Sequence, residues 1–141
     1  MIALFALLGW HVYQRTGVPK MLTDRYVIVG SSRFKVTIAR TEDEQSRGLS
    51  GVSRLSKGDG MYFMFDTPRR QSFWNKGMLI PFDLLWIKDN RVLGIEHKVR
   101  AEIDGAETVF PPSEIDGAIE IVGDQADNAG ISVGDTVKYL W

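Results

Sequence analysis

The densest group of chemically useful side chains lies in one short segment, Arg69-Arg70-Gln71-Ser72-Phe73-Trp74-Asn75-Lys76. Basic and amide groups flank two aromatic rings there. An indole face with amide and ammonium donors can hold a sugar ring, an anionic ligand or a peptide. The same residues can instead cover the core with Phe73 and Trp74 while the arginines face water. Both interpretations stay open, and our candidate ligand-binding residues are Arg47, Phe73, Trp74, Asn75, Lys76 and Asp83.

Asp83 is the second unusual position, because it stands between Ile80-Pro81-Phe82 and Leu84-Leu85-Trp86. A carboxylate in such an apolar setting loses hydration, and its pKa rises unless donors or a cation meet it. It can then serve as a general acid or base, with Lys76 as an electrostatic stabiliser. The structural alternative is that Asp83 accepts backbone N–H groups or pairs with a buried arginine, for which Arg47 is a suitable partner.

The remaining inventory excludes several classes of chemistry. The chain has no cysteine, so disulfides, thiolate nucleophiles and cysteine-based zinc sites are excluded. It contains neither phosphate-binding glycine motif, and we expect no cofactor. Its two histidines, His11 and His97, are too few to suggest a metal site. Seventeen basic and eighteen acidic residues give no field that would hold nucleic acid.

The elements that must position these residues are mostly short strands. Alternation of apolar and polar residues predicts a strand over residues 33–39, and uninterrupted apolar runs predict buried strands over 60–65 and 83–88. Asp89-Asn90 predicts a tight hairpin into residues 91–99, where Leu93, Ile95, His97 and Val99 would share one face. Residues 100–116 are expected to form a long loop.

Two helices and two further strands complete the pattern. A capping box formed by Thr41 and Glu44 predicts a helix over residues 42–49. Residues 118–122 and 136–141 are typical of strands, and residues 124–129 of one or two helical turns. We therefore expect a mainly β (α+β) fold: a compact, barrel-like antiparallel or mixed sheet of about seven short strands with one or two short helices.

The N-terminal segment is different in composition. Residues 1–13 are apolar apart from His11, and as a helix they would reach about 20 Å, less than the roughly 30 Å hydrocarbon core of a membrane. An anchor, a cleaved signal and an amphipathic helix on the domain stay open. We expect a hydrophobic helix and linker over residues 1–24, then a single β-rich domain over 25–141.

Several stretches together resemble the bacterial and archaeal family called domain of unknown function 192, or DUF192. They are Glu44 with Arg47-Gly48-Leu49, residues 60–65, Phe73-Trp74, residues 80–87, Ile119-Glu120-Ile121, Gly130-Ile131 and residues 134–137. The resemblance runs from about Phe34 to the C-terminus and implies a mainly β, barrel-like fold. It also implies that a signal or anchor often precedes the domain. The family usually has Met-Lys-Asn-Thr after Phe-Trp, where this chain has Asn75-Lys76-Gly77-Met78.

Three functions follow from these observations. The first is a membrane-associated binding module, periplasmic or extracytoplasmic, that recognises a small molecule, glycan or protein through residues 69–76. The second is a small hydrolase-like enzyme with Asp83 as acid or base. The third is a structural domain that docks on a partner protein. The binding module is favoured, because no complete catalytic set can be assembled from these residues.

Overall fold

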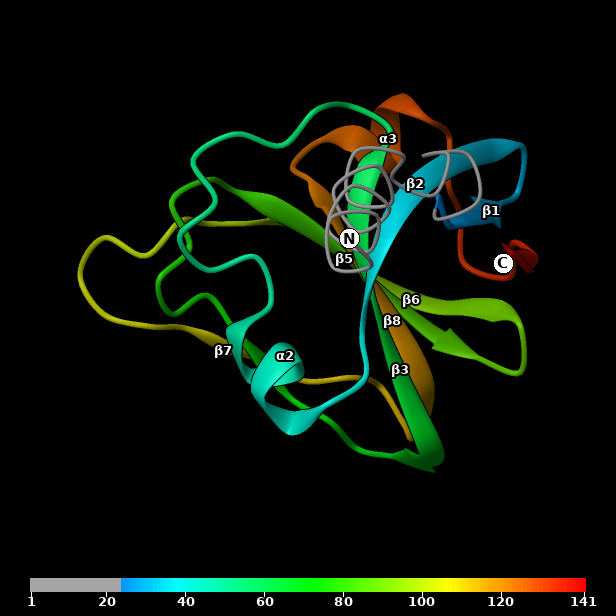
Figure 1. Cartoon of the computed structure of the whole chain (residues 1–141), viewed down its shortest axis with the longest axis horizontal. Coiled ribbons are helices and arrows are strands. Elements are labelled where there is room, and N and C mark those ends of the chain that lie inside the picture. Colours follow the sequence, from blue (N-terminus) through cyan, green and yellow to red (C-terminus); the bar gives the residue numbers. More distant parts are fainter. Residues whose placement is uncertain (1–23) are drawn as a thin grey trace, which may run out of the picture.

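Strands form in this chain where β-branched and aromatic residues alternate with polar ones or run together. The structure is a computed structural model and describes residues 24–141. Within that range the strands are β1 (Tyr26–Val29), β2 (Ser32–Ala39), β3 (Asp59–Arg69), β4 (Phe73–Trp74), β5 (Phe82–Lys88), β6 (Arg91–Val99), β7 (Thr108–Val109), β8 (Ile115–Val122) and β9 (Val137–Leu140). The helices are α2 (Glu42–Arg47) and α3 (Gln125–Asn128) (Figure 1).

The expected N-terminal hydrophobic helix lies outside the described residues. Neither helix found between residues 24 and 141 has the length and apolar character needed to cross a membrane. The expected loop over residues 100–116 is shorter than predicted, because it contains β7 and because β8 already begins at Ile115.

Seven strands form one curled sheet with the order β6-β5-β8-β3-β2-β1-β9. Only β2 and β3 pair in parallel within this sheet of the described chain, and the other neighbours are antiparallel. The edge strands β6 and β9 approach each other at one end only. Arg91 forms an isolated bridge to Thr136 there, and the Val137 N–H donates to the Asn90 carbonyl over 2.8 Å. The sheet is therefore a half-barrel, and the mainly β prediction is confirmed.

The hairpin between β5 and β6 forms at the predicted position. Asp89 and Asn90 have φ values of 49° and 58°, as a two-residue turn of type I′ requires. The predicted shared face of β6 is wrong, because bulges shift its register against β5 twice. Leu93 and Val99 therefore pack on one side of the sheet and Ile95 on the other.

The central strands β3, β5 and β8 are covered on both faces, which explains the uninterrupted apolar run in β5. The first core lies inside the half-barrel and consists of Val27, Val29, Phe34, Val36, Tyr62, Leu85, Ile87, Val92, Ile119, Ile121, Ala126, Ile131 and Val137. The second core lies on the opposite face and consists of Ala39, Leu49, Phe63, Phe65, Phe73, Met78, Phe82, Leu84, Trp86, Val99, Ile115 and Ala118.

Helix α2 begins with the predicted capping box. The Glu44 N–H donates to Thr41 Oγ1 over 3.2 Å, and the Thr41 N–H donates to Glu44 Oε2 over 3.0 Å. The helix ends at Arg47, two residues earlier than expected, because Gly48 turns the chain with a φ of 50°. None of its residues is buried, so α2 is held by polar contacts of its own and by Leu49, which follows it and is buried in the second core.

Candidate functional site

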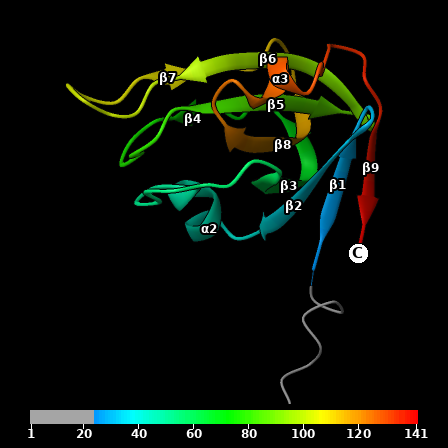
Figure 2. The ribbon, with the colours of Figure 1, turned by 90° about the horizontal axis from the view of Figure 1, so that it is seen from above.

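A pocket of about 440 Å³ opens between α2 and the outer face of the sheet. Figure 2 shows α2 and β4 at the end of the molecule away from β1 and β9. Such a volume is typical of small-ligand sites. The pocket lies over the second core and is lined by Glu42, Gln45, Ser46, Arg47, Gly48, Ser50, Phe63, Phe65, Arg69, Gln71, Ser72, Phe73, Trp74, Met78, Thr108 and Glu120.

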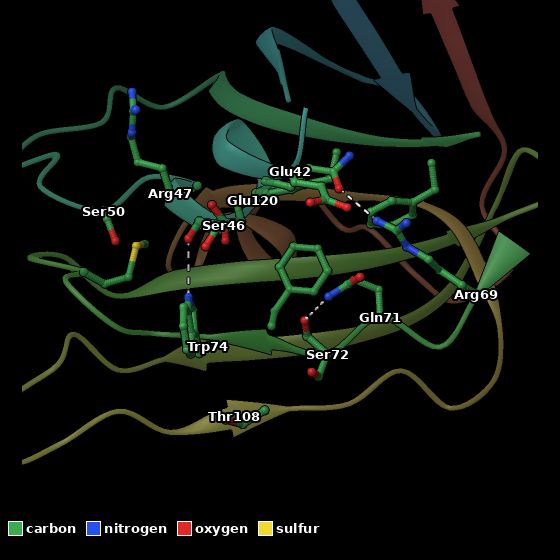
Figure 3. Close-up of a pocket in the computed structure, with 16 residues that line it drawn as sticks. Glu42, Ser46, Arg47, Ser50, Arg69, Gln71, Ser72, Trp74, Thr108 and Glu120 are labelled. Carbon is green, nitrogen blue, oxygen red and sulfur yellow. Dashed lines mark hydrogen bonds between the residues drawn. The ribbon is translucent and has the colours of Figure 1, made fainter. Parts of the chain in front are cut away.

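Trp74 forms one wall of this pocket and is 45% exposed (Figure 3). Its Nε1 donates a hydrogen bond of 3.4 Å to the Ser46 carbonyl on α2. The ammonium of Lys76 lies 5.2 Å from the centre of the indole ring but does not line the pocket. The ammonium therefore stabilises the indole, and the exposed part of the ring that lines the pocket is available to a ligand.

Gln45 attaches α2 to β3 at the other end of the pocket. Its Nε2 donates to the Met64 carbonyl over 2.9 Å, and its Oε1 accepts from Arg69 Nη2 over 2.9 Å. The Arg69 guanidinium in turn lies 4.4 Å above the centre of the Phe65 ring. Figure 3 shows Arg69, which bonds to Gln45, on the side of the pocket opposite Trp74, so hydrogen bonds connect α2 to β3 on one side and to β4 on the other.

Glu120 lies at the floor of the pocket and is 3% exposed. The residues directly opposite it on the neighbouring strands, Met61 and Leu84, are apolar. Burial raises the pKa of Glu120 from 4.5 to about 8, and the Leu49 N–H, which donates to Oε2 over 3.2 Å, lowers it by less. Glu120 is therefore a neutral carboxylic acid at pH values below about 8.

The second oxygen of Glu120, Oε1, has no hydrogen-bond partner among residues 24–141. In that range Gln125 Oε1 alone is fully buried without a partner, so Oε1 of Glu120 is open to the pocket. Gly48 leaves room for this carboxyl group. A Cβ atom at position 48 would lie 3.2 Å from Oε2 and 3.4 Å from Oε1.

Asp83 does not share this pocket with Trp74. It lies on the inner face of the sheet, fully buried, and accepts backbone N–H groups from Lys98, Asp124 and Ala126 over 2.8, 3.2 and 2.8 Å. The predicted convergence of Asp83 and Trp74 beside one hollow is therefore wrong, because alternation along β5 sends Asp83 and Leu84 to opposite faces. Asp83 joins the end of β6 to the start of α3.

The other expected site residues divide into two groups. Phe73 and Arg47 line the pocket with Trp74, and Phe73 is buried with its ring edge-on to Phe63 at 4.7 Å. Arg47 extends away from the pocket floor in Figure 3 and does not contact Asp83.

Asn75 is buried outside the pocket, where it accepts the Glu107 N–H and donates to the Arg100 carbonyl.

The sequence pattern did not single out Glu120 as a site residue. Ile119-Glu120-Ile121 alternates like a half-buried strand whose glutamate faces water. Two signals were available: Ile119-Glu120-Ile121 is part of the family resemblance, and Gly48 at a helix end permits close approach of another group.

The family model of DUF192, described as an uncharacterized ACR, matches residues 26–139. The chain belongs to the DUF192 family. This match confirms the resemblance found in the sequence and includes every residue that lines the pocket of this DUF192 protein.

Two solved structures are similar to this DUF192 protein. A protein of unknown function from Novosphingobium aromaticivorans is 29% identical, with a TM-score of 0.74 over 80% of this chain and 83% of that one. A putative transcription regulator from Sinorhizobium meliloti is 19% identical, with a TM-score of 0.76 over 82% of this chain and 92% of that one. The second similarity shows the fold alone. A comparison with curated proteins found no match.

Proposed function

We propose that this DUF192 protein is a binding module that takes a small molecule into the pocket beneath α2. The observation that carries the proposal is one cavity of about 440 Å³ with an exposed indole on its wall and a buried carboxyl on its floor. Large aromatic surface with a few placed polar groups is typical of ligand sites. Asp83, bonded to three backbone N–H groups, supports a binding module over an enzyme that uses this aspartate.

The proposed function is tested by ligand-induced thermal shifts in the unaltered chain and in a Trp74 variant. We expect at least one of three probes, N-acetylglucosamine, glucuronate and choline, to raise the thermal midpoint of the full chain. A probe at one hundred times its Kd adds about 2.7 kcal/mol of stability. Trp74→Ala should abolish that rise, because the pocket loses its wall.

Trp141→Ala is the matched control, since Trp141 is 51% exposed and does not line the pocket. It should keep the rise. The proposal is refuted when all three probes leave the midpoint of the unaltered chain unchanged. It is equally refuted when Trp74→Ala and Trp141→Ala respond alike.

We also propose that the N-terminal segment associates the protein with a membrane, on its periplasmic or extracytoplasmic side. The apolar composition of residues 1–13 supports association with a membrane, and the signal or anchor that often precedes the domain in DUF192 proteins supports the side. The full chain should fractionate with membranes. Replacing both Leu7 and Leu8 by Asp should release it, since each Asp costs about 2.5–3.5 kcal/mol at a membrane centre. Equal fractionation of the two chains would contradict this part of the proposal.

A hydrolase-like enzyme is the second candidate function, and the observation that favours it is Glu120. A buried carboxyl that opens into a pocket and holds its proton near neutral pH is suited to general acid catalysis. Turnover of a glycoside that disappears in Glu120→Gln while binding persists would support this candidate over a binding module.

A further inference from the structure

We propose that Glu120 is the group that recognises the ligand, and that it donates a hydrogen bond from its neutral carboxyl to an uncharged sugar stacked on Trp74. This inference rests on the proposed function, because it names the ligand class of the same pocket. It also gives the two residues different roles: Trp74 stacks on the ligand, and Glu120 bonds to it.

The geometry at the pocket floor leaves Glu120 one free position. Oε2 already accepts the Leu49 N–H, so the proton of the neutral acid lies on Oε1, the oxygen that opens to the pocket. A neutral carboxyl donates through that O–H and accepts through its other oxygen. A ligand that reaches the floor must therefore present an acceptor atom there, or it leaves a buried donor unpaired.

The charged groups around Glu120 do not supply a counter-ion. Glu42 and Arg47 line the pocket from α2, and Arg69 lines it from β3, where its guanidinium bonds to Gln45. The residues that meet Glu120 from β3 and β5, Met61 and Leu84, carry no charge. Beyond Leu84, Glu96 on β6 accepts from Trp86 Nε1, and Lys76 lies over Trp74 outside the lining. With burial as its main influence, Glu120 has a raised pKa of about 8.

An uncharged sugar fits this arrangement better than a charged ligand. Its apolar C–H face can stack on the indole of Trp74, and its hydroxyl groups can reach the small polar side chains of Ser46, Ser72 and Thr108. A hydroxyl or acetamido oxygen then accepts from Glu120. An organic cation would instead need the ionised carboxylate, and an anion would need a cation or a cluster of N–H groups at the floor.

The test is a calorimetric titration of the full chain with chitotriose, a trimer of N-acetylglucosamine. The affinity of the unaltered chain should be about tenfold weaker at about pH 9 than at about pH 7, because Glu120 loses its proton between them. Glu120→Gln keeps a donor that does not titrate, so it should bind within about threefold of the unaltered chain at both pH values. Glu120→Ala should bind about 5- to 100-fold more weakly at both.

Other outcomes overturn the inference in distinguishable ways. Chitotriose binding that is lost in Glu120→Gln, or that strengthens above about pH 8, would show that the ionised carboxylate is the binding form. Binding of choline or glucuronate without binding of chitotriose would replace the ligand class and leave the pocket as a binding site. Failure of chitotriose, N-acetylglucosamine, glucuronate and choline alike would instead refute the proposed function itself. The thermal midpoints of both Glu120 variants establish that each one is folded.

Discussion

Glu120 and Asp83 are buried carboxyl groups on paired strands, and the direction in which each side chain points decides its chemistry. Asp83 points into the half-barrel, where three backbone N–H groups meet its two oxygens. Glu120 points to the outer face, where one N–H meets one oxygen. The first group is occupied by the fold, whereas the second is available to a ligand.

Asp83→Asn should destabilise the protein without changing the pocket. The amide that replaces one carboxylate oxygen is a donor, and it would face backbone N–H groups that are also donors. We expect a loss of about 2–4 kcal/mol in the free energy of unfolding measured in urea. Chitotriose affinity of the folded variant should stay within about twofold of the original. An unchanged stability would contradict the role of Asp83 as a backbone acceptor.

The pKa of Glu120 predicts a pH dependence of stability with a definite sign. Between 4.5, its ordinary pKa, and about 8, its pKa in the folded chain, the folded state holds a proton that the unfolded state has released. Stability should therefore fall as pH rises through this window, by about 1.4 kcal/mol per pH unit from this group. Glu120→Gln should lack that contribution and exceed the unaltered chain in stability above about pH 8. Parallel curves of unfolding free energy against pH for the two proteins would contradict the shift.

The sequence indicated part of the candidate site at this scale. Phe73 and Trp74 were predicted from their basic and amide neighbours, and both line the pocket. Glu120 was not predicted, because its alternation with isoleucines is also typical of a solvated strand face. Only the long-range placement of α2 over β8 turns that face into the floor of a cavity.

At the scale of elements, α2 is unusual because no residue on it is buried. Besides the buried Leu49 that follows it, its attachment depends on Gln45, which bonds to Met64 and Arg69, and on the bond from Trp74 to Ser46. A short helix held by a few polar bonds opens at lower free-energy cost than the packed strands below it. We therefore expect α2, which covers the pocket, to open more readily than the strands that line it.

Gln45→Ala should weaken the attachment of α2 while leaving the sheet intact. We expect a global stability loss of about 1 kcal/mol and faster hydrogen exchange at the backbone N–H groups of Gln45 and Gly48. Chitotriose affinity should fall by about 3- to 10-fold, since ordering α2 then draws on binding energy. Asp43→Ala is the control, because Asp43 is exposed on the same helix and does not line the pocket. Equal exchange rates in the two variants would contradict the role of Gln45 in attaching α2 to β3.

Local signals predicted most elements correctly. The capping box of Thr41 and the Asp89-Asn90 turn are set by neighbouring residues, and both form where expected. The face pattern of β6 was missed because bulges against β5 arise from pairing between strands, which no local pattern encodes. A short strand over residues 72–74 was expected and corresponds to β4, but β7 and its pairing were missed for the same reason, since the pair joins Phe73 to Val109 across a long loop.

At the scale of the whole molecule, one sheet separates two hydrophobic cores. Leu84 and Leu85 are consecutive, fully buried residues of β5 that enter different cores. Both cores stabilise the fold, but only the outer core borders the pocket. The inner core closes the half-barrel, and the outer core supports the pocket floor beside Glu120.

Leu84→Ala and Leu85→Ala form a matched pair that tests this division. Each should lower the free energy of unfolding by about 2–5 kcal/mol, because each leaves a cavity in a packed core. Only Leu84→Ala should also weaken chitotriose binding, by about 5-fold or more, since Leu84 lies opposite Glu120. Equal affinities of the two folded variants would show that the pocket floor does not depend on the outer core.

The most direct test of a ligand-recognising acid in this pocket is an NMR titration of the Glu120 side-chain carboxyl carbon in the full chain. Without sugar, the carboxyl should titrate with a pKa of about 8. With saturating chitotriose the midpoint should move higher still, because a ligand that accepts the carboxyl proton binds the protonated form more tightly. A carboxyl that titrates near 4.5, or a midpoint that saturating sugar leaves unchanged or lowers, would contradict the account.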